Sequence, residues 1–266
     1  MKVLLATGNH PRHQYLVRLF KENGFLDALI MEERENFSPV TPEGLDARTG
    51  QFFTTHFRKR EEAENFVFGS RISEFENSLR IAPGEINSAD SLEFLMKNKP
   101  DVVITAGIGI LGNEFLKLAP KETWNLHGGL SPWYKGAITH FWPSYQLEPQ
   151  FTGCTLHYIS SKIDAGAIIH QTPAVLKEGD GLQELSSRSL KLGFDEIITV
   201  LQILKKQRSV KSVKQASTGK LWLKRDWKPQ HLNLIYGLYQ DRVVDAYLEG
   251  KIERNTPALV QQGNLI

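Results

Sequence analysis

The chain has 266 residues, 41% hydrophobic and 23% charged, which excludes a disordered or fibrous protein and allows one large domain or two small ones. Thirty-two basic against 30 acidic residues leave a net charge of +2, far from the overall positive field typical of nucleic-acid-binding proteins. The single cysteine, Cys154, excludes an internal disulfide and a cysteine-based zinc cluster. No signal-peptide pattern and no apolar run of about 18 residues is present, so we expect a soluble, cytoplasmic protein with no membrane partner.

Apolar runs and helical spacings alternate along the chain. In order, they predict a strand at 2–7, a helix at 12–22, a strand at 28–31, an irregular segment at 32–55, an exposed helix at 56–66, a helix at 91–97, strands at 102–106 and 123–127, a helix at 137–147, strands at 152–159 and 167–171, and a helix at 182–206. This alternation predicts an α/β fold with a Rossmann-like, mostly parallel sheet flanked by helices. We expect a catalytic domain over 1–206 and a short C-terminal extension over 207–266, basic at first and then aromatic and helical.

A glycine-rich segment, 107–112, fits the pattern G-x-G-x-x-G and follows a predicted strand. A dinucleotide-binding fingerprint also needs an acidic residue about 20 positions later, where this chain has Ser131, Pro132 and Trp133. We therefore expect a tight turn into a short helix rather than a nicotinamide or flavin site. The glycines would still let a flat ligand approach the backbone closely.

Three polar residues form the candidate catalytic group. Asn125 and His127 lie two apart on one predicted strand, so their side chains point to the same face, and Asp164 lies in a later loop between strands. Taken singly, each has an ordinary structural explanation: a strand-end amide, a partly buried histidine and a turn aspartate. Cys154, on a strand between Gly153 and Thr155, is expected to be a buried core thiol.

Together with their surroundings, these residues carry a family resemblance. The elements are Asn125-x-His127, the loop Leu-Ser-Pro-Trp-Tyr-Lys-Gly that ends at Gly136, the run 152–157 and the run Asp164-Ala-Gly-Ala-Ile-Ile-His-Gln171. They resemble the formyltransferases that use N10-formyltetrahydrofolate, a family that includes enzymes acting on methionyl-tRNA, on glycinamide ribonucleotide and on amino sugars of bacterial surface polysaccharides such as lipopolysaccharide. The resemblance covers 100–172 firmly and is weak before residue 90.

The resemblance implies a catalytic triad of Asn125, His127 and Asp164. The types suit formyl transfer, because an amide can donate to the oxyanion, an imidazole can take the proton of the amine, and a carboxylate can stabilise the imidazolium. It also implies a folate pocket lined by Ala106, Gly107, Ile108, Gly109, Ile110, Leu111 and Ile163. Beside the acceptor it implies Trp133, Tyr134, Lys135 and Gly136. One of three arginines, Arg12, Arg58 or Arg60, is expected to pair with a pyrophosphate of the acceptor. No metal is expected, and the pair His10 and His13 is interpreted as a turn or a phosphate contact.

The preferred acceptor is a nucleotide-linked amino sugar, since aromatic side chains in and behind the loop at 133–142 suit pyranose rings. Methionyl-tRNA is the first alternative: the basic stretch 205–228 could touch phosphates, but we expect a solvated surface and no nucleic acid partner. About sixty residues follow position 206, fewer than the second domain of the methionyl-tRNA enzymes. A folate-binding hydrolase or sensing module is the second alternative. The aromatic tail is compatible with a homodimer.

Overall fold

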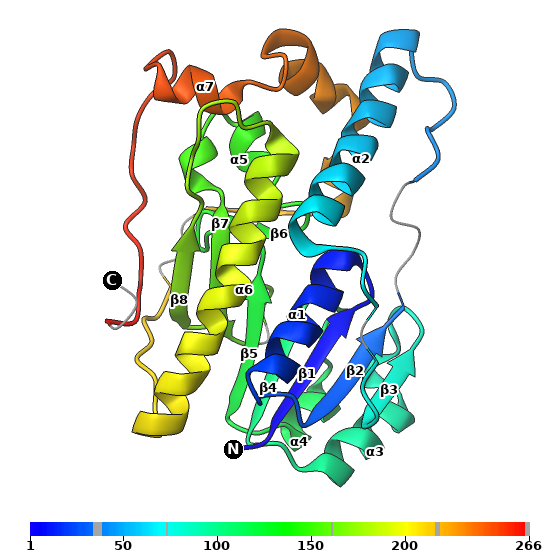
Figure 1. Ribbon diagram of the computed structural model, residues 1–266, viewed down its shortest axis with the longest axis vertical. Coiled ribbons are helices and arrows are strands. Elements are labelled where there is room, and N and C mark those ends of the chain that lie inside the picture. Colours follow the sequence, from blue (N-terminus) through cyan, green and yellow to red (C-terminus); the bar gives the residue numbers. More distant parts are fainter. Residues whose placement is uncertain (34–38, 73, 161, 216–218, 264–266) are drawn as a thin grey trace.

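A central seven-stranded sheet organises the computed structural model, which describes residues 1–33, 39–72, 74–160, 162–215 and 219–263 (Figure 1). The strands are β1 (Val3–Gly8), β2 (Ala28–Glu32), β3 (Ser78–Ile81), β4 (Val102–Ala106), β5 (Glu122–His127), β7 (Gly153–Tyr158) and β8 (Ile168–Pro173). Their order is β3-β2-β1-β4-β5-β7-β8. The four pairs among the first five strands are parallel, and the pairs β5–β7 and β7–β8 are antiparallel. The predicted α/β fold with a mostly parallel sheet is confirmed.

Helices cover both faces of this sheet because its strands are apolar on both sides. Val3 and Leu5 of β1 share a core cluster with side chains of α1 (Pro11–Glu22) and α6 (Leu182–Gln207). Leu4 and Ala6 point the other way, into a cluster with η1 (Glu85–Asn87), α3 (Ala89–Asn98) and α4 (Asn113–Leu118). The buried thiol of Cys154 belongs to the first cluster, as predicted, and burial raises its pKa to about 12. No helix among the described residues is long and apolar enough to cross a membrane.

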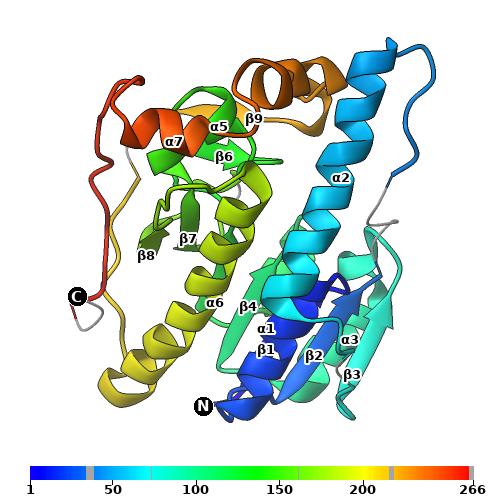
Figure 2. The same ribbon diagram turned by 45° about the horizontal axis from the view of Figure 1, so that its top comes forward.

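A third, largely aromatic cluster includes parts of the C-terminal segment and Leu182 of α6. The short elements of this region lie beyond one end of the sheet (Figure 2): β6 (Tyr134–Gly136), α5 (Trp142–Tyr145), η2 (Pro149–Phe151), β9 (Lys220–Trp222), η3 (Lys224–Asp226), η4 (Pro229–His231), the π-helical turn η5 (Asn233–Leu238) and α7 (Val243–Leu248). The rings of Trp142 and Trp222 stack with centroids 4.0 Å apart. The C-terminal segment contributes the two short helical elements η5 and α7, in which Ile235 and Val243 are buried. The division at 206/207 stays a prediction.

Two predicted elements need correction, and one strand was not predicted. The segment 32–55 was expected to be irregular, but its last residues form the start of a 22-residue helix, α2 (Ala47–Phe68). Residues 34–38 of this segment lie outside the described part. Asp46 caps this helix by accepting a hydrogen bond from the Thr49 N–H at 3.0 Å, a signal hidden among the preceding prolines and glycines. The helix is also not simply exposed, because Phe53 and His56 are buried against the C-terminal segment.

The other two differences concern weak local patterns. The predicted helix at 137–147 shrinks to the four residues of α5, because the preceding loop pairs with β9 as the strand β6 and Ile138 adopts a positive φ of 59°. Strand β3 was not predicted at all. It lies at the edge of the sheet with only Ile81 buried, so its sequence lacks the apolar run that marks a central strand.

Asp241 caps α6 from a distant part of the chain, since Gly181 at the start of that helix has no side chain to do so. Its Oδ1 accepts from the Leu182 N–H at 2.9 Å, and its Oδ2 accepts from Lys59 Nζ at 2.6 Å. We expect Asp241→Ala to lower the free energy of unfolding by about 2–4 kcal/mol, because a cap and a largely buried ion pair are lost together. Urea denaturation measures this value. The exposed pair Arg58–Glu62 provides the control: Glu62→Ala should cost less than about 1 kcal/mol, and equal losses would contradict the prediction.

Candidate active site

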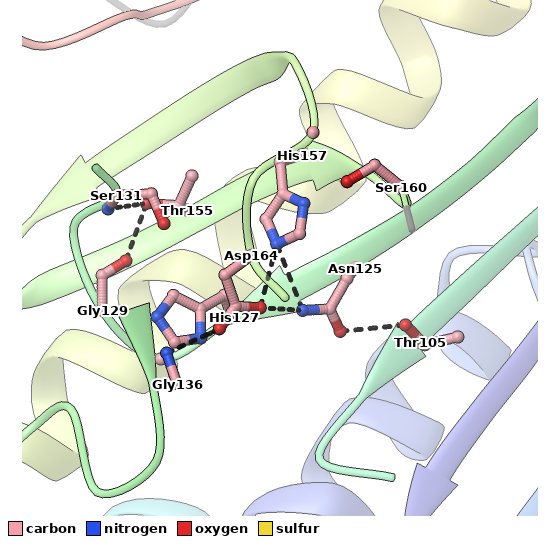
Figure 3. Close-up of polar contacts among 12 residues, drawn as sticks. Thr105, Asn125, His127, Gly129, Ser131, Gly136, Thr155, His157, Ser160 and Asp164 are labelled. Atoms are coloured by element: carbon pink, nitrogen blue, oxygen red, sulfur yellow. Dashed lines mark hydrogen bonds and ion pairs between the residues drawn. The ribbon is translucent and has the colours of Figure 1, made fainter. Parts of the chain in front are cut away.

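The candidate site begins at the carboxyl ends of two parallel strands, β4 and β5. Thr105 and Asn125 are direct register partners in these strands. The Thr105 hydroxyl donates to Asn125 Oδ1 at 2.9 Å, which leaves the amide Nδ2 pointing away from β4 (Figure 3). Because an amide nitrogen only donates, this bond fixes which end of Asn125 offers hydrogen bonds to the site.

Asp164 reaches the same place from the turn between β7 and β8. Its φ is 46°, a left-handed conformation that is uncommon for a residue other than glycine. Oδ2 accepts from the Gly136 N–H at 2.8 Å and lies 3.4 Å from His127 Nδ1, and Oδ1 accepts from Asn125 Nδ2 at 3.4 Å. The structure therefore brings the three predicted catalytic side chains together around one carboxylate (Figure 3).

His127 is buried, 6% exposed, and both of its ring nitrogens face oxygen atoms. Nε2 lies 2.9 Å from the Tyr134 carbonyl oxygen, which can only accept, so Nε2 carries the proton. Burial lowers the pKa of His127, while the Asp164 carboxylate partly opposes that shift. The neutral ring thus keeps an unprotonated Nδ1 beside the carboxylate, which is the arrangement of a base whose conjugate acid would be stabilised.

The electrostatics of Asp164 are set by competing effects. Burial raises its pKa, but the attraction of the carboxylate to the His127 and His157 imidazoles in their protonated forms, together with the Gly136 N–H, holds the pKa well below its usual range. The carboxylate is therefore ionised throughout the neutral range. Among the described residues, no group of three or more His, Cys, Asp or Glu side chains is arranged to hold a metal ion.

His157 is a member of this cluster that sequence reasoning missed. Its Nδ1 donates to its neighbour's carbonyl oxygen, that of Tyr158, at 2.8 Å, which leaves Nε2 to accept from Asn125 Nδ2 at 3.3 Å. Nε2 also lies 3.4 Å from Asp164 Oδ1. His157 is the register partner of Asn125 across the β5–β7 pair. That pairing was the missing signal, because the antiparallel return of β7 could not be derived from the spacing of the histidines.

We expect His157→Leu to reduce kcat about 10- to 100-fold, the usual effect of removing a group that orients a site residue. Without the acceptor at Nε2, the Asn125 amide loses one of the contacts that aim it. The control is His170→Leu in the neighbouring strand β8, where an equally buried imidazole pairs with Glu196 at 2.8 Å. Steady-state kinetics of both variants test this: a similar loss in the control would mean that only packing is being measured.

The predicted folate-lining residues lie where two loops meet the carboxyl edge of the sheet. Ala106 ends β4 and is buried, and Leu111 is also buried, whereas Ile110 and Ile163 are 72% and 41% exposed. The segment 107–112 is a turn into the short helix α4, as predicted. Three of its backbone groups are held by distant side chains: the Gly109 N–H by Glu32, and the Gly112 N–H and Ile110 carbonyl by Asn87. These contacts fix the backbone of the loop.

Only some of the residues predicted to bind the acceptor lie next to the Asp164 cluster. Gly136 holds Asp164, and Lys135 and Trp133 are partly exposed beside it. The Tyr134 side chain is instead buried in the aromatic cluster with its hydroxyl on Glu148, so only its backbone carbonyl faces the site. Arg12 lies at the start of α1, where its guanidinium forms an ion pair with Glu64 of α2, outside the Asp164 cluster.

Comparison with known proteins identifies the fold and the family. The family model described as "Formyl transferase" matches residues 44–201, more than half of the chain. The chain belongs to the formyl transferase family. Asn125, His127, His157 and Asp164 all lie within the matched residues.

Individual relatives share only limited sequence identity with this chain. The methionyl-tRNA formyltransferase of Thermotoga maritima is 32% identical over 126 residues, which are 47% of this chain and 40% of that protein. The chain thus matches less than half the length of this curated relative. A sugar N-formyltransferase from Shewanella sp. FDAARGOS_354 superposes with a TM-score of 0.57 at 16% identity, covering 88% of this chain and 87% of that one.

A second solved structure contains ligands. The formyltransferase PseJ from Anoxybacillus kamchatkensis, in complex with UDP-4,6-dideoxy-4-formamido-L-AltNAc and tetrahydrofolate, superposes with a TM-score of 0.53 at 18% identity. The match covers 91% of this chain and 95% of that one. At such identities the two superpositions establish the shared fold.

Proposed function

We propose that this chain transfers the formyl group of N10-formyltetrahydrofolate to the amine of a nucleotide-linked amino sugar. The observation that carries the proposal is the convergence of Asn125, His127 and Asp164 at the carboxyl edge of the sheet. Substrates bind at this edge in open α/β sheets, and these side chains supply the three chemical needs of acyl transfer to an amine.

The proposal gives each side chain a role that its position supports. The amine attacks the formyl carbon, a C–N bond forms, and the carbonyl oxygen becomes an oxyanion that accepts a hydrogen bond from Asn125 Nδ2. The proton lost by the amine passes to Nδ1 of His127, and the Asp164 carboxylate at 3.4 Å stabilises the resulting imidazolium. The bond from the formyl carbon to the folate nitrogen then breaks, and the proton is returned to that nitrogen.

The Asn125 amide is engaged before the reaction starts. Its Nδ2 hydrogens are directed at His157 Nε2 and Asp164 Oδ1 over 3.3 and 3.4 Å, both long for hydrogen bonds to nitrogen donors. An oxyanion is a stronger acceptor than either at those distances, so it can take one of these hydrogens while the other bond keeps the amide aimed.

A sugar acceptor is supported by the surface next to the carboxylate and by the fold neighbours. In the loop around Gly136, Trp133 is partly exposed and packs on Phe151, and Ile138 is 41% exposed with a left-handed backbone. Apolar and aromatic side chains of this kind suit the faces of pyranose rings. The fold neighbours include a sugar N-formyltransferase and a structure holding a UDP-linked formamido sugar with tetrahydrofolate.

Methionyl-tRNA is the second candidate acceptor, favoured by the 32% identity with the Thermotoga maritima enzyme. The described lysines and arginines near the end of α6, Lys205, Lys206 and Arg208, are exposed and available to phosphates. Recognition of RNA through them would depend steeply on salt concentration.

The experiment incubates the protein with N10-formyltetrahydrofolate and, in separate arms, with nucleotide-linked amino sugars, with methionyl-tRNA, or with no amine. Formation of tetrahydrofolate is followed by absorbance, and the acceptor is examined by mass spectrometry for one added formyl group. We expect turnover only with an amino-sugar nucleotide. Transfer to methionyl-tRNA would select the second candidate, and formate release without any amine would identify a hydrolase.

A further inference from the structure

The chain after α6 returns to the candidate site along β8 and β6. Val213 and Ile168 exchange both backbone hydrogen bonds at 2.8 Å, and further on β9 pairs with β6 in parallel register (Figure 2). We call residues 209–215 and 219–222 the strap; residues between them lie outside the described part. The strap follows residue 201, where the match to the family model ends.

Gln215 of the strap holds the turn that carries Asp164. Its Nε2 donates to the Asp164 carbonyl oxygen at 2.9 Å and to the Gly166 carbonyl oxygen at 2.7 Å. One side-chain amide therefore fixes two carbonyls on either side of Ala165. Since Asp164 adopts a left-handed φ of 46°, which costs free energy for a non-glycine residue, the turn needs such external contacts to persist.

The strap also contacts Gly136, the second residue that holds Asp164. Gly136, whose N–H donates to Asp164 Oδ2, has a φ of 94°, and a Cβ there would lie 2.1 Å from the Trp222 carbonyl oxygen. The Ala137 N–H donates to that same Trp222 oxygen at 2.8 Å. The backbone of β9 is thus in direct contact with the residue that orients the carboxylate.

We propose that the strap is a positioning element of the candidate active site, and that Gln215 is a positioning residue that sets the place of the Asp164 carboxylate. This inference rests on the proposed function for its kinetic consequences. Gln215 itself is bonded to backbone carbonyls, so it acts through Asp164 and takes no part in proton transfer.

Gln215→Leu removes both hydrogen bonds at nearly constant volume, and the chain supplies a matched control. The Gln262 Nε2 likewise donates to two carbonyls, those of Ile169 at 2.6 Å and Lys211 at 2.8 Å, and joins the C-terminal segment to β8 and the strap. We expect Gln215→Leu to lower kcat about 10- to 100-fold with KM values little changed, as for other groups that orient a site residue. Gln262→Leu should lower Tm by a similar amount but leave kcat within about twofold, because Gln262 contacts the strap at Lys211 and not at Gln215 or Trp222, the residues next to the Asp164 turn and Gly136.

A double-mutant cycle separates positioning from general destabilisation. In the Asp164→Asn background, Gln215→Leu should cause little further loss of kcat, because its effect acts through the carboxylate. Equal kcat values for the Gln215 and Gln262 variants, or full additivity with Asp164→Asn, would overturn the inference. If Gln215→Leu does not fold, Gln215→Asn replaces it, since the shorter amide keeps its polarity but cannot reach both carbonyls.

An NMR titration of the His127 ring tests the inference without relying on activity. The Asp164 charge raises the pKa of His127 against the effect of burial, so a displaced carboxylate should lower that pKa in Gln215→Leu and not in Gln262→Leu. An unchanged His127 titration in Gln215→Leu would refute the positioning role. A shifted titration in a protein that formylates none of the acceptors would instead support the strap's role while the proposed function fails.

Discussion

Replacing Asn125 with alanine should lower kcat by about 10²–10³, the usual loss when one oxyanion donor is removed. The amide lies on β5, is oriented by Thr105 and His157, and presents Nδ2 toward the carboxylate cluster. The contact with the oxyanion forms mainly in the transition state, so the affinity for the folate should change little. Single-turnover kinetics give the rate, and calorimetric titration with tetrahydrofolate gives the affinity.

Thr105→Val is a second variant of the same contact, and we expect it to have a smaller effect on the rate. It removes the hydroxyl that holds Asn125 Oδ1 but keeps the β-branched shape inside the strand. We expect a loss of about tenfold, since the amide remains present but can turn over. A modest effect of Asn125→Ala, or one that is entirely a rise in KM for the folate, would contradict the assignment of Asn125 as an oxyanion donor.

The fold could be predicted from the sequence wherever both faces of an element are buried. Runs such as Val102–Ala106 are apolar at every position except Thr105, and helix 182–206 repeats its apolar positions over many turns, so both were placed within about two residues. The edge strand β3 and the start of α2 carry no such signal. Their structure depends on neighbours supplied by distant parts of the chain, which a local pattern cannot contain.

The candidate site was also predictable only where a local pattern or the family resemblance identifies its residues. The period of two along β5 places Asn125 and His127 on one face, and the family resemblance supplies Asp164. His157 and Gln215 were not found because each joins the site through pairing of distant segments: β7 against β5, and the strap against the Asp164 turn. The burial of the Tyr134 side chain was missed for the same reason, since its aromatic neighbours include residues from beyond position 220.

Asp164→Asn should reduce kcat by about 10²–10⁴, the range assigned to a group needed for general acid–base catalysis. The substitution keeps the shape of the side chain but removes the charge that faces His127 Nδ1 at 3.4 Å. The imidazolium formed on proton transfer then has no counter-charge in a buried setting. The control is Asp180→Asn, which removes another buried carboxylate, paired with Arg188 and away from the site, and should leave kcat within about twofold.

We also expect the stability of the wild type and of Asp164→Asn to depend differently on pH. The folded-state pKa of Asp164 is depressed, so its charge contributes stability above the unfolded value of about 3.9, and this contribution is lost as the pH falls through the folded value. The difference in unfolding free energy between wild type and Asp164→Asn should therefore narrow below about pH 4. His127 acts in the opposite sense at higher pH: the unfolded ring takes up a proton below about 6.5, the buried ring resists it, and without Asp164 it resists more. The difference should thus widen once the pH falls below the folded-state pKa of His127 in the wild type, which lies below 6.5. Urea denaturation across this range tests both changes, and a difference that stays constant with pH would mean that Asp164 and His127 are not coupled.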